Sequence, residues 1–219
     1  FLVLQKTIIF SKAGISDIPK EIKFSIISDN SFTVSLVTET AVPGFVIFGQ
    51  GESLDQTALD DRDSGSKNAR FTHHVTLKNL APTTAYSFKI GSKGELLSQS
   101  TAPITSDTPP LPEPLMGKVE TADGKVPAEA LVYVNMERST VLSSFIRDDG
   151  NFLITLNNAR TADLSKYLTL TDSTKINLTA QAGTAEATGK DLLFSDRFVS
   201  QDLVLQQTET VKEASWPSD

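Results

Sequence analysis

Residues 31–38 read SFTVSLVT, a stretch in which apolar and polar residues alternate. Side chains of an extended chain point alternately to its two faces, so period-two alternation is typical of a strand with one buried face. One face here carries Phe32, Val34 and Leu36, and the other carries Thr33, Ser35 and Val37. The pattern predicts a half-buried strand in an antiparallel sheet.

Further short runs of β-branched and aromatic residues follow, separated by turn residues. They are EIKFSII (21–27), GFVIFG (44–49), THHVTL (72–77) and AYSFKIGS (85–92). No window of helical length carries an apolar stripe with capping residues. We therefore expect an all-β chain of two tandem Ig-like or Greek-key β-sandwich domains with an extended apolar N-terminal segment.

Composition excludes several classes of function. The chain has 219 residues, no cysteine and a formal net charge of −7. Without cysteine it can form no disulfide, no thiolate metal site and no thiol nucleophile. A pI near 4.9 argues against nucleic acid as a partner, because nucleic-acid binding needs a basic surface.

The stretch STAPITSDTPPLPEP (100–114) has the highest density of residues that interrupt helices and strands. Five prolines among small polar residues cannot continue a helix or a central strand, and they favour an extended, fairly stiff connection. This places a domain boundary in the middle of the chain. The predicted division is an apolar segment at 1–17, a first domain at 18–98, a linker at 99–114, a second domain at 115–206 and a polar tail at 207–219.

The stretch LAPTTAY (80–86) precedes the strand SFKIGS. Its Leu80, Pro82 and Tyr86 resemble a tyrosine corner, in which the tyrosine hydroxyl reaches back to the backbone at the crossing between two sheets. Residues 18–98 as a whole resemble a fibronectin type III module. One departure is Leu36, where that family often has tryptophan. The resemblance implies a role in structure and spacing rather than in catalysis.

The second half begins MGKVETADGKVPAEALVYV (116–134) and continues SSFIRDDGNFLITL (143–156). Asp149-Gly150 predicts a hairpin turn, because glycine accepts the positive φ that such turns need. Residues 115–206 resemble carboxypeptidase-regulatory-like and related transthyretin-like modules, which implies a stalk or presentation role. The stretches 164–183 and 198–206 would supply the remaining strands.

Five side chains of the first domain could suggest a metal site. They are Asp60, Asp61, Asp63, His73 and His74. Adjacent histidines on a strand point to opposite faces, so the two cannot chelate one ion together. We expect a solvated acidic loop and histidines on the strand surface, with calcium at the loop as the alternative, and we assign no metal.

Catalytic motifs are missing from the sequence as well. It contains no Gly-x-Ser-x-Gly elbow and no glycine-rich phosphate loop, and it has only two histidines. We therefore expect no enzyme and no cofactor. Lys118 raises the alternative of an isopeptide bond, with Asp202 as the carboxylate on the last predicted strand, and Asn177 heads an NLT sequon for a glycan.

The first ten residues, FLVLQKTIIF, are mostly apolar. As a helix they would span about 15 Å, half of a bilayer core, so they cannot cross a membrane alone. They could be the end of a membrane anchor, a strand within the first domain, a strand donated to a neighbouring subunit, or a remnant of processing. The predicted polymer contact is Phe1, Leu2, Val3, Leu4, Ile8, Ile9 and Phe10.

These observations favour a non-enzymatic extracellular structural protein. The leading hypothesis is a filament subunit that assembles head-to-tail with copies of itself by donating the strand at 1–10. A second is a membrane-anchored adhesion or spacer ectodomain, with membrane contact only through a segment upstream of residue 1. A third is a noncatalytic accessory region of a secreted hydrolase. A polysaccharide or protein on the cell surface is the further partner considered, although Trp216, the single tryptophan, lies in the tail.

Overall fold

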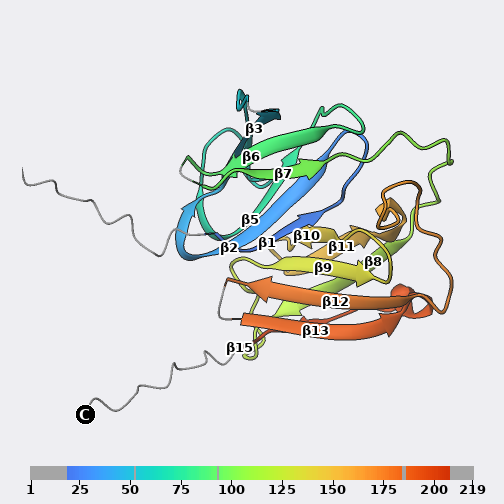
Figure 1. Cartoon of the computed structure of the whole chain (residues 1–219). Coiled ribbons are helices and arrows are strands. Elements are labelled where there is room, and N and C mark those ends of the chain that lie inside the picture. Colours follow the sequence, from blue (N-terminus) through green and yellow to red (C-terminus); the bar gives the residue numbers. More distant parts are fainter. Residues whose placement is uncertain (1–18, 52, 93, 184–185, 208–219) are drawn as a thin grey trace, which may run out of the picture.

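The computed structural model describes residues 19–51, 53–92, 94–183 and 186–207. In these ranges strands are the main regular structure, helix is confined to short 3-10 turns, and the strands form two β-sandwiches that lie side by side (Figure 1). The expectation of an all-β, Ig-like chain is therefore confirmed. The segment at 1–17 and almost all of the tail at 207–219 lie outside the described residues.

The first sandwich pairs a three-stranded sheet, in the order β1-β2-β5, with a four-stranded sheet in the order β4-β3-β6-β7. All its neighbouring strands are antiparallel. Three strands facing four is an arrangement of the Ig-like, fibronectin type III kind. The strands are β1 (Lys20–Ser25), β2 (Phe32–Pro43), β3 (Phe45–Gln50), β4 (Gln56–Leu59), β5 (Ala69–Leu77), β6 (Ala85–Ile90) and β7 (Leu97–Ser100).

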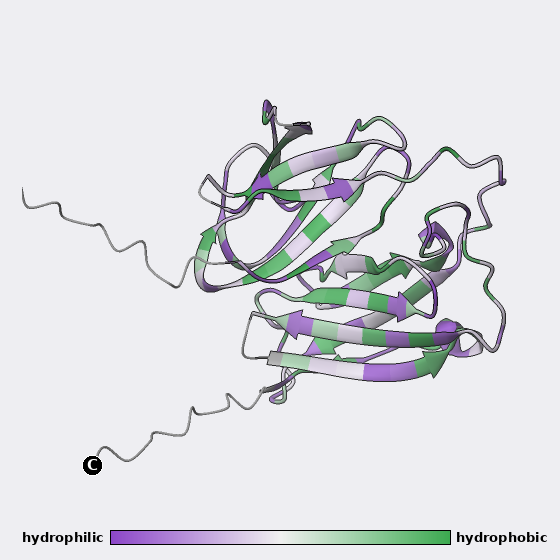
Figure 2. Cartoon of the chain, viewed as in Figure 1, coloured by the Kyte–Doolittle hydropathy of each residue, from purple (hydrophilic) through white to green (hydrophobic). Residues whose placement is uncertain are grey.

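The core of this sandwich is built on the apolar face of β2. Phe32, Val34 and Leu36 are all buried, and they pack with Phe88 of β6 and other apolar residues in one cluster. Figure 2 shows apolar and polar blocks alternating along β2, as its sequence predicts. Leu36 fills its place in the core without the larger ring that the family resemblance would put there.

The second sandwich pairs a five-stranded sheet, in the order β10-β9-β12-β13-β15, with a three-stranded sheet in the order β11-β8-β14. One of its pairings, β8 with β14, is parallel. Its elements are β8 (Pro114–Glu120), β9 (Leu131–Met136), β10 (Leu142–Phe145), β11 (Asn151–Thr155), η2 (Leu156–Asn158), β12 (Lys175–Ala182), β13 (Glu186–Leu193), η3 (Phe194–Phe198), β14 (Leu203–Val204) and β15 (Gln206–Gln207).

The predicted hairpin of the second sandwich is wrong in its pairing, although the turn is present. Gly150 has a φ of +82° and its N–H donates to the carbonyl of Arg147. The flanking strands, however, belong to opposite sheets: β10 pairs with β9, and β11 pairs with β8. The turn therefore carries the chain across the core.

β2 is buried on both faces from Phe32 to Thr38, which the sequence did not predict. The second sandwich covers the outer face of the sheet β1-β2-β5. Each sandwich also sends one apolar side chain into the other, because Ile26 packs against the second core and Leu164 packs against the first. The two sandwiches therefore meet over a packed interface as well as through their covalent connection.

The chain path brings both ends of the described region to one side of the pair. β1 begins and β15 ends on that side, and the proline-rich connection between β7 and β8 lies on the opposite side (Figure 1). Gly183, just before β13, lies close to β5, since a Cβ built on it would be 3.9 Å from the Phe71 Cβ. The connection is thus on the far side of the molecule from the start of β1 and the end of β15.

Candidate functional site

The interface between the sandwiches carries a row of buried hydroxyl and imidazole groups. The Ser25 Oγ of β1 and the Ser143 Oγ of β10 are 2.6 Å apart, and the Ser143 Oγ is also 2.8 Å from the His74 Nε2 of β5. Beside them, the backbone N–H of Ile26 donates to the carbonyl of Val141 at 2.9 Å. β1 and β10 are edge strands of their sheets, and this contact covers part of each edge, which hinders pairing with a strand of another chain.

Ser143, His74 and Asp61 together have the distances of a serine–histidine–aspartate triad. The His74 Nδ1 is 2.8 Å from the Asp61 Oδ2, which orients the ring toward Ser143. A nucleophilic serine needs an open side for its substrate. Here Ser143 is 5% exposed, His74 is 4% exposed, and Ser25 occupies the other side of the hydroxyl. The arrangement therefore joins two sandwiches and leaves no approach to the hydroxyl.

The remaining hydroxyls of this face are also satisfied. The Thr76 Oγ1 donates to Asp61 at 2.6 Å and is 2.9 Å from the Thr33 Oγ1 on the neighbouring strand. The ring of Phe145 lies edge-on to His74, with centroids 5.7 Å apart. Because each polar group has a partner, the face can be buried without the penalty of unpaired donors and acceptors.

Tyr133 of β9 makes a second polar contact across the interface. Its hydroxyl donates to the Ser35 Oγ of β2 at 3.1 Å, and the Lys23 Nζ of β1 lies 4.1 Å from the centre of its ring. Burial raises the pKa of Tyr133 to about 12. Burial also lowers the pKa of Lys23, against the smaller opposing effect of Glu21. The phenol is therefore neutral and a hydrogen-bond donor at physiological pH.

Glu129 of the second sandwich reaches the backbone of β5. Its Oε2 accepts from the N–H groups of Phe71 and Thr72, at 2.8 Å each, and from the Thr72 Oγ1 at 3.1 Å. β5 is an edge strand, and its pairing with β2 shifts register between Val37 and Val42, opposite these residues. The carboxylate thus satisfies two consecutive backbone N–H groups at an irregular point of the edge strand.

The predicted solvated loop and surface histidines are wrong, because Asp60 and both histidines are buried. Asp60 accepts from the Arg62 Nε and Nη2 at 2.8 Å each and from the backbone N–H of His74 at 3.0 Å. Burial acts to raise the pKa of Asp60, but the hydrogen bonds and charge of Arg62 outweigh it and the pKa lies below its ordinary value. Asp60 is therefore an ionised structural group.

His73 is 1% exposed and points to the opposite face from His74. Its Nδ1 is 3.8 Å from Asp60, and no described residue hydrogen-bonds either ring nitrogen. Burial lowers its pKa, against the smaller effect of Asp60. In the described ranges, no group of three or more metal-binding side chains is arranged around a common point.

The other residues singled out from the sequence lie apart from this interface. Leu80 and Tyr86 are buried and Pro82 is exposed, and the Tyr86 hydroxyl accepts from the backbone N–H of Ala81 at 2.8 Å and from the Gln50 Nε2 at 3.1 Å. The seven residues of the predicted polymer contact lie outside the described residues.

The contact between Lys118 and Asp202 joins the backbone of the lysine to the carboxylate of the aspartate and does not involve the lysine side chain. The Lys118 N–H donates to the Asp202 Oδ1 at 3.2 Å, whereas the Lys118 ammonium pairs with Glu120 at 2.5 Å. The hydrogen bond and charge of Glu120 raise the pKa of Lys118. The lysine is thus partly exposed and charged, and its Nζ is directed to a different carboxylate.

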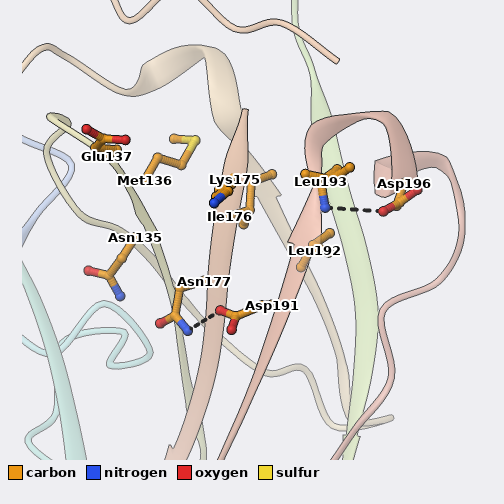
Figure 3. Close-up of a pocket in the computed structure, with 10 residues that line it drawn as sticks. All are labelled: Asn135, Met136, Glu137, Lys175, Ile176, Asn177, Asp191, Leu192, Leu193 and Asp196. Atoms are coloured by element: carbon orange, nitrogen blue, oxygen red, sulfur yellow. Dashed lines mark hydrogen bonds between the residues drawn. The ribbon is translucent and has the colours of Figure 1, made fainter. Parts of the chain in front are cut away.

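A hollow of about 650 Å³ lies on the outer face of the five-stranded sheet, beside η3 (Figure 3). Asn135, Asn177 and Asp191 form a row across β9, β12 and β13, and the Asn177 Nδ2 donates to the Asp191 Oδ1 at 2.8 Å. Asp196 closes one end by accepting from the backbone N–H of Leu193 at 3.2 Å. Amides and carboxylates here could hydrogen-bond a polar ligand. The sequence drew attention to Asn177 alone, as a sequon.

Comparisons with known proteins add the following. No model of a known protein family matches the chain, and no curated protein matches it. Among solved structures, it is similar to the FN1–FN3 domains of chicken CNTN1, with 11% identity over 86% of this chain and 68% of that one, at a TM-score of 0.28. It is also similar to a pullulanase from Anoxybacillus sp. LM18-11, with 8% identity over 78% of this chain and 25% of the pullulanase, at a TM-score of 0.27.

The fold assignment therefore rests on the strand order and not on these similarities. Within the part of the chain that the structure places, no helix is long and apolar enough to span a bilayer.

Proposed function

We propose that this chain is a non-catalytic structural unit of a cell-surface or secreted protein, in which two β-sandwiches are held as one rigid block. The observation that carries the proposal is the buried contact of Ser143 with both Ser25 and His74. Such a contact needs tight registration of two sheet faces, because hydrogen bonds weaken steeply with distance and angle. A pair joined only by a flexible linker would not maintain it.

Three further observations support a block. Ile26 and Leu164 each pack into the core of the other sandwich, Tyr133 donates across the interface, and Glu129 holds the edge of β5. The triad-like group of Asp61, His74 and Ser143 is buried among these contacts, which supports a structural role over a hydrolytic one. In this role the block would hold whatever is attached at its ends in a fixed orientation.

Distance measurements between spin labels test the block directly. The chain has no cysteine, so Lys78→Cys and Lys190→Cys place one exposed label on each sandwich. We expect a single narrow distance distribution that does not change with salt. A Ser35→Lys variant should broaden it, and an Asn151→Lys variant on an exposed strand should not. A broad distribution in the unsubstituted protein would contradict the proposal.

The filament remains a second candidate, favoured by the large apolar side chains at Phe1, Leu4 and Ile8. Donation of a strand needs an acceptor, and both cores in the described ranges are already covered by their own strands. The acceptor would then be a free sheet edge, such as β7, rather than an open groove. Lysine substitutions at Leu4 and Ile8 should abolish filaments seen by electron microscopy. Unchanged filaments would exclude this mode of assembly.

A further inference from the structure

The connection between β7 and β8 is rich in proline and lies outside every strand and helix. Between Thr101 and Pro114 it carries four prolines at 103, 109, 110 and 112. Proline fixes φ near −65° and restricts the residue before it to extended conformations. No described peptide bond is cis. The run TPPLP (108–112) therefore favours a polyproline II conformation, with three residues per turn.

This segment exposes apolar side chains that a sandwich would normally bury. Leu111 is 82% exposed, the highest value among the large apolar side chains that the structure describes, and Ile104 is 71% exposed. Thr108, Pro109 and Pro112 are exposed as well. The segment lies on the opposite side of the molecule from the start of β1 and the end of β15 (Figure 1).

Both ends of the segment are held by the sandwiches. Upstream, the N–H of Ala102 donates to the carbonyl of Ser28 at 2.8 Å, and the Ala102 carbonyl accepts from the N–H of Thr83 at 3.1 Å. Downstream, Asn157 donates from its Nδ2 to the carbonyl of Pro110 at 3.1 Å, and its Oδ1 accepts from the N–H of Glu113 at 3.4 Å. A segment held at both ends loses less entropy when it binds.

An ion pair connects the proline-rich segment to a second exposed apolar surface. Glu113 accepts from the Arg197 Nε at 2.8 Å, and the guanidinium lies 3.9 Å from the centre of the Phe198 ring. Phe198 and the following Val199 are both largely exposed. The end of the proline-rich segment and the exposed Phe198 are therefore linked through Glu113 and Arg197.

We propose that the segment 108–112 is a recognition site for a protein whose groove is lined by aromatic side chains. Pro109 and Pro112 have the PxxP spacing, and with three residues per turn they share one face of the helix. Leu111 supplies an adjacent apolar contact, and its exposure leaves it free to enter a pocket. This goes beyond a rigid presentation role, since it specifies what the far end of the block would present.

The test uses the full chain and two probes, a WW domain selective for Pro-Pro-Leu-Pro peptides and an SH3 domain. We expect saturable binding to at least one probe, measured by calorimetry. Leu111→Ala and Pro112→Ala should each weaken it by about tenfold, as for residues at the centre of an interface. Their thermal unfolding midpoints should match that of the unsubstituted chain, because both side chains are exposed.

Leu96→Ala is the matched control, since Leu96 is also an exposed leucine, at 56%, but lies in the first sandwich. It should bind like the unsubstituted chain. Absence of binding to both probes would overturn the proposal, as would equal losses for Leu96→Ala and Leu111→Ala. Self-association of the chain that Leu111→Ala abolishes would also overturn it, because the occupant would then be a second copy.

Discussion

The two three-stranded sheets of the molecule differ in what covers their outer faces. The outer face of β1-β2-β5 carries short hydroxyls such as Thr33 and Ser35, and the second sandwich buries it. The outer face of β11-β8-β14 carries Met116, Lys118 and Leu153, and it stays at least partly exposed. The apolar content of a face therefore does not decide its burial. A hydroxyl face can be buried when the facing sheet provides partners at matching positions, as Ser143 and Tyr133 do.

The largest loss of stability should come from a charged side chain introduced on the covered face. Ser35 is fully buried and accepts from Tyr133, so in Ser35→Lys an ammonium would lose its hydration without a partner. We expect the free energy of unfolding, measured in urea, to fall by about 3–5 kcal/mol. Leu153→Lys on the open face should change it by less than about 0.5 kcal/mol. Equal effects of the two substitutions would mean that the first face is not covered in solution.

A smaller loss of stability should follow when a methyl group is added at Gly44, on the core side of the covered sheet. A Cβ at Gly44 would lie 2.2 Å from the His73 Nδ1, and His73 has no room to move. Gly44→Ala should lower the free energy of unfolding by about 1–3 kcal/mol through overpacking. Gly189→Ala is the control, because its Cβ would meet Thr179 at an ordinary 3.4 Å. Retention of full stability in Gly44→Ala would show that this packing is wrong.

A double-mutant cycle can measure how much the contact between the hydroxyls of Ser25 and Ser143 contributes to stability. Ser25→Ala and Ser143→Ala each remove one side of a 2.6 Å contact between the sandwiches. We expect a coupling free energy of about 1 kcal/mol, the usual net contribution of one hydrogen bond. Strictly additive losses in chemical unfolding would mean that the two hydroxyls do not meet. The same cycle between Lys118 and Glu120, a partly exposed pair on the open face, should show no measurable coupling.

Acid should destabilise the first sandwich through His73, which lies on the core side of β5, behind the covered face. Burial holds its pKa in the folded state below the unfolded value of about 6.5. Above that pH both states are neutral; below it the unfolded state binds a proton first, so the free energy of unfolding falls as the pH drops. Asp60, whose folded pKa is also lowered, adds its own loss only nearer pH 4. A His73→Gln variant should flatten the profile between about pH 6.5 and 4, and an unchanged slope would exclude His73 as its source.

The sequence predicted those parts of the fold that depend on neighbours along the strand. The alternation in β2 identified its core residues Phe32, Val34 and Leu36, and Asp149-Gly150 identified a turn. It missed β13, because a strand containing Gly189 and Lys190 has little β-branched or apolar signal.

The burial of Ser35 and His74 could not be predicted from neighbouring residues. Threonine, serine and histidine on one face are typical of a solvated surface unless another sheet matches them. The matching groups, Tyr133 and Ser143, lie far along the chain and on other strands. Hydrophobic periodicity and strand propensity therefore could not predict the interface. They could not predict the hollow around Asn135 either, because the residues that line it come from separate strands.

The return of the chain to its starting side has a mechanical consequence. Tension applied between β1 and β15 would act at the end of the interface nearest Phe71 and Gly183, where Glu129 holds the edge of β5. Contacts would then separate one after another, as in unzipping, and not all together. The proline-rich connection at the far end would still join the two sandwiches. The unit could thus lengthen under load by opening the pair, with both sandwich cores intact.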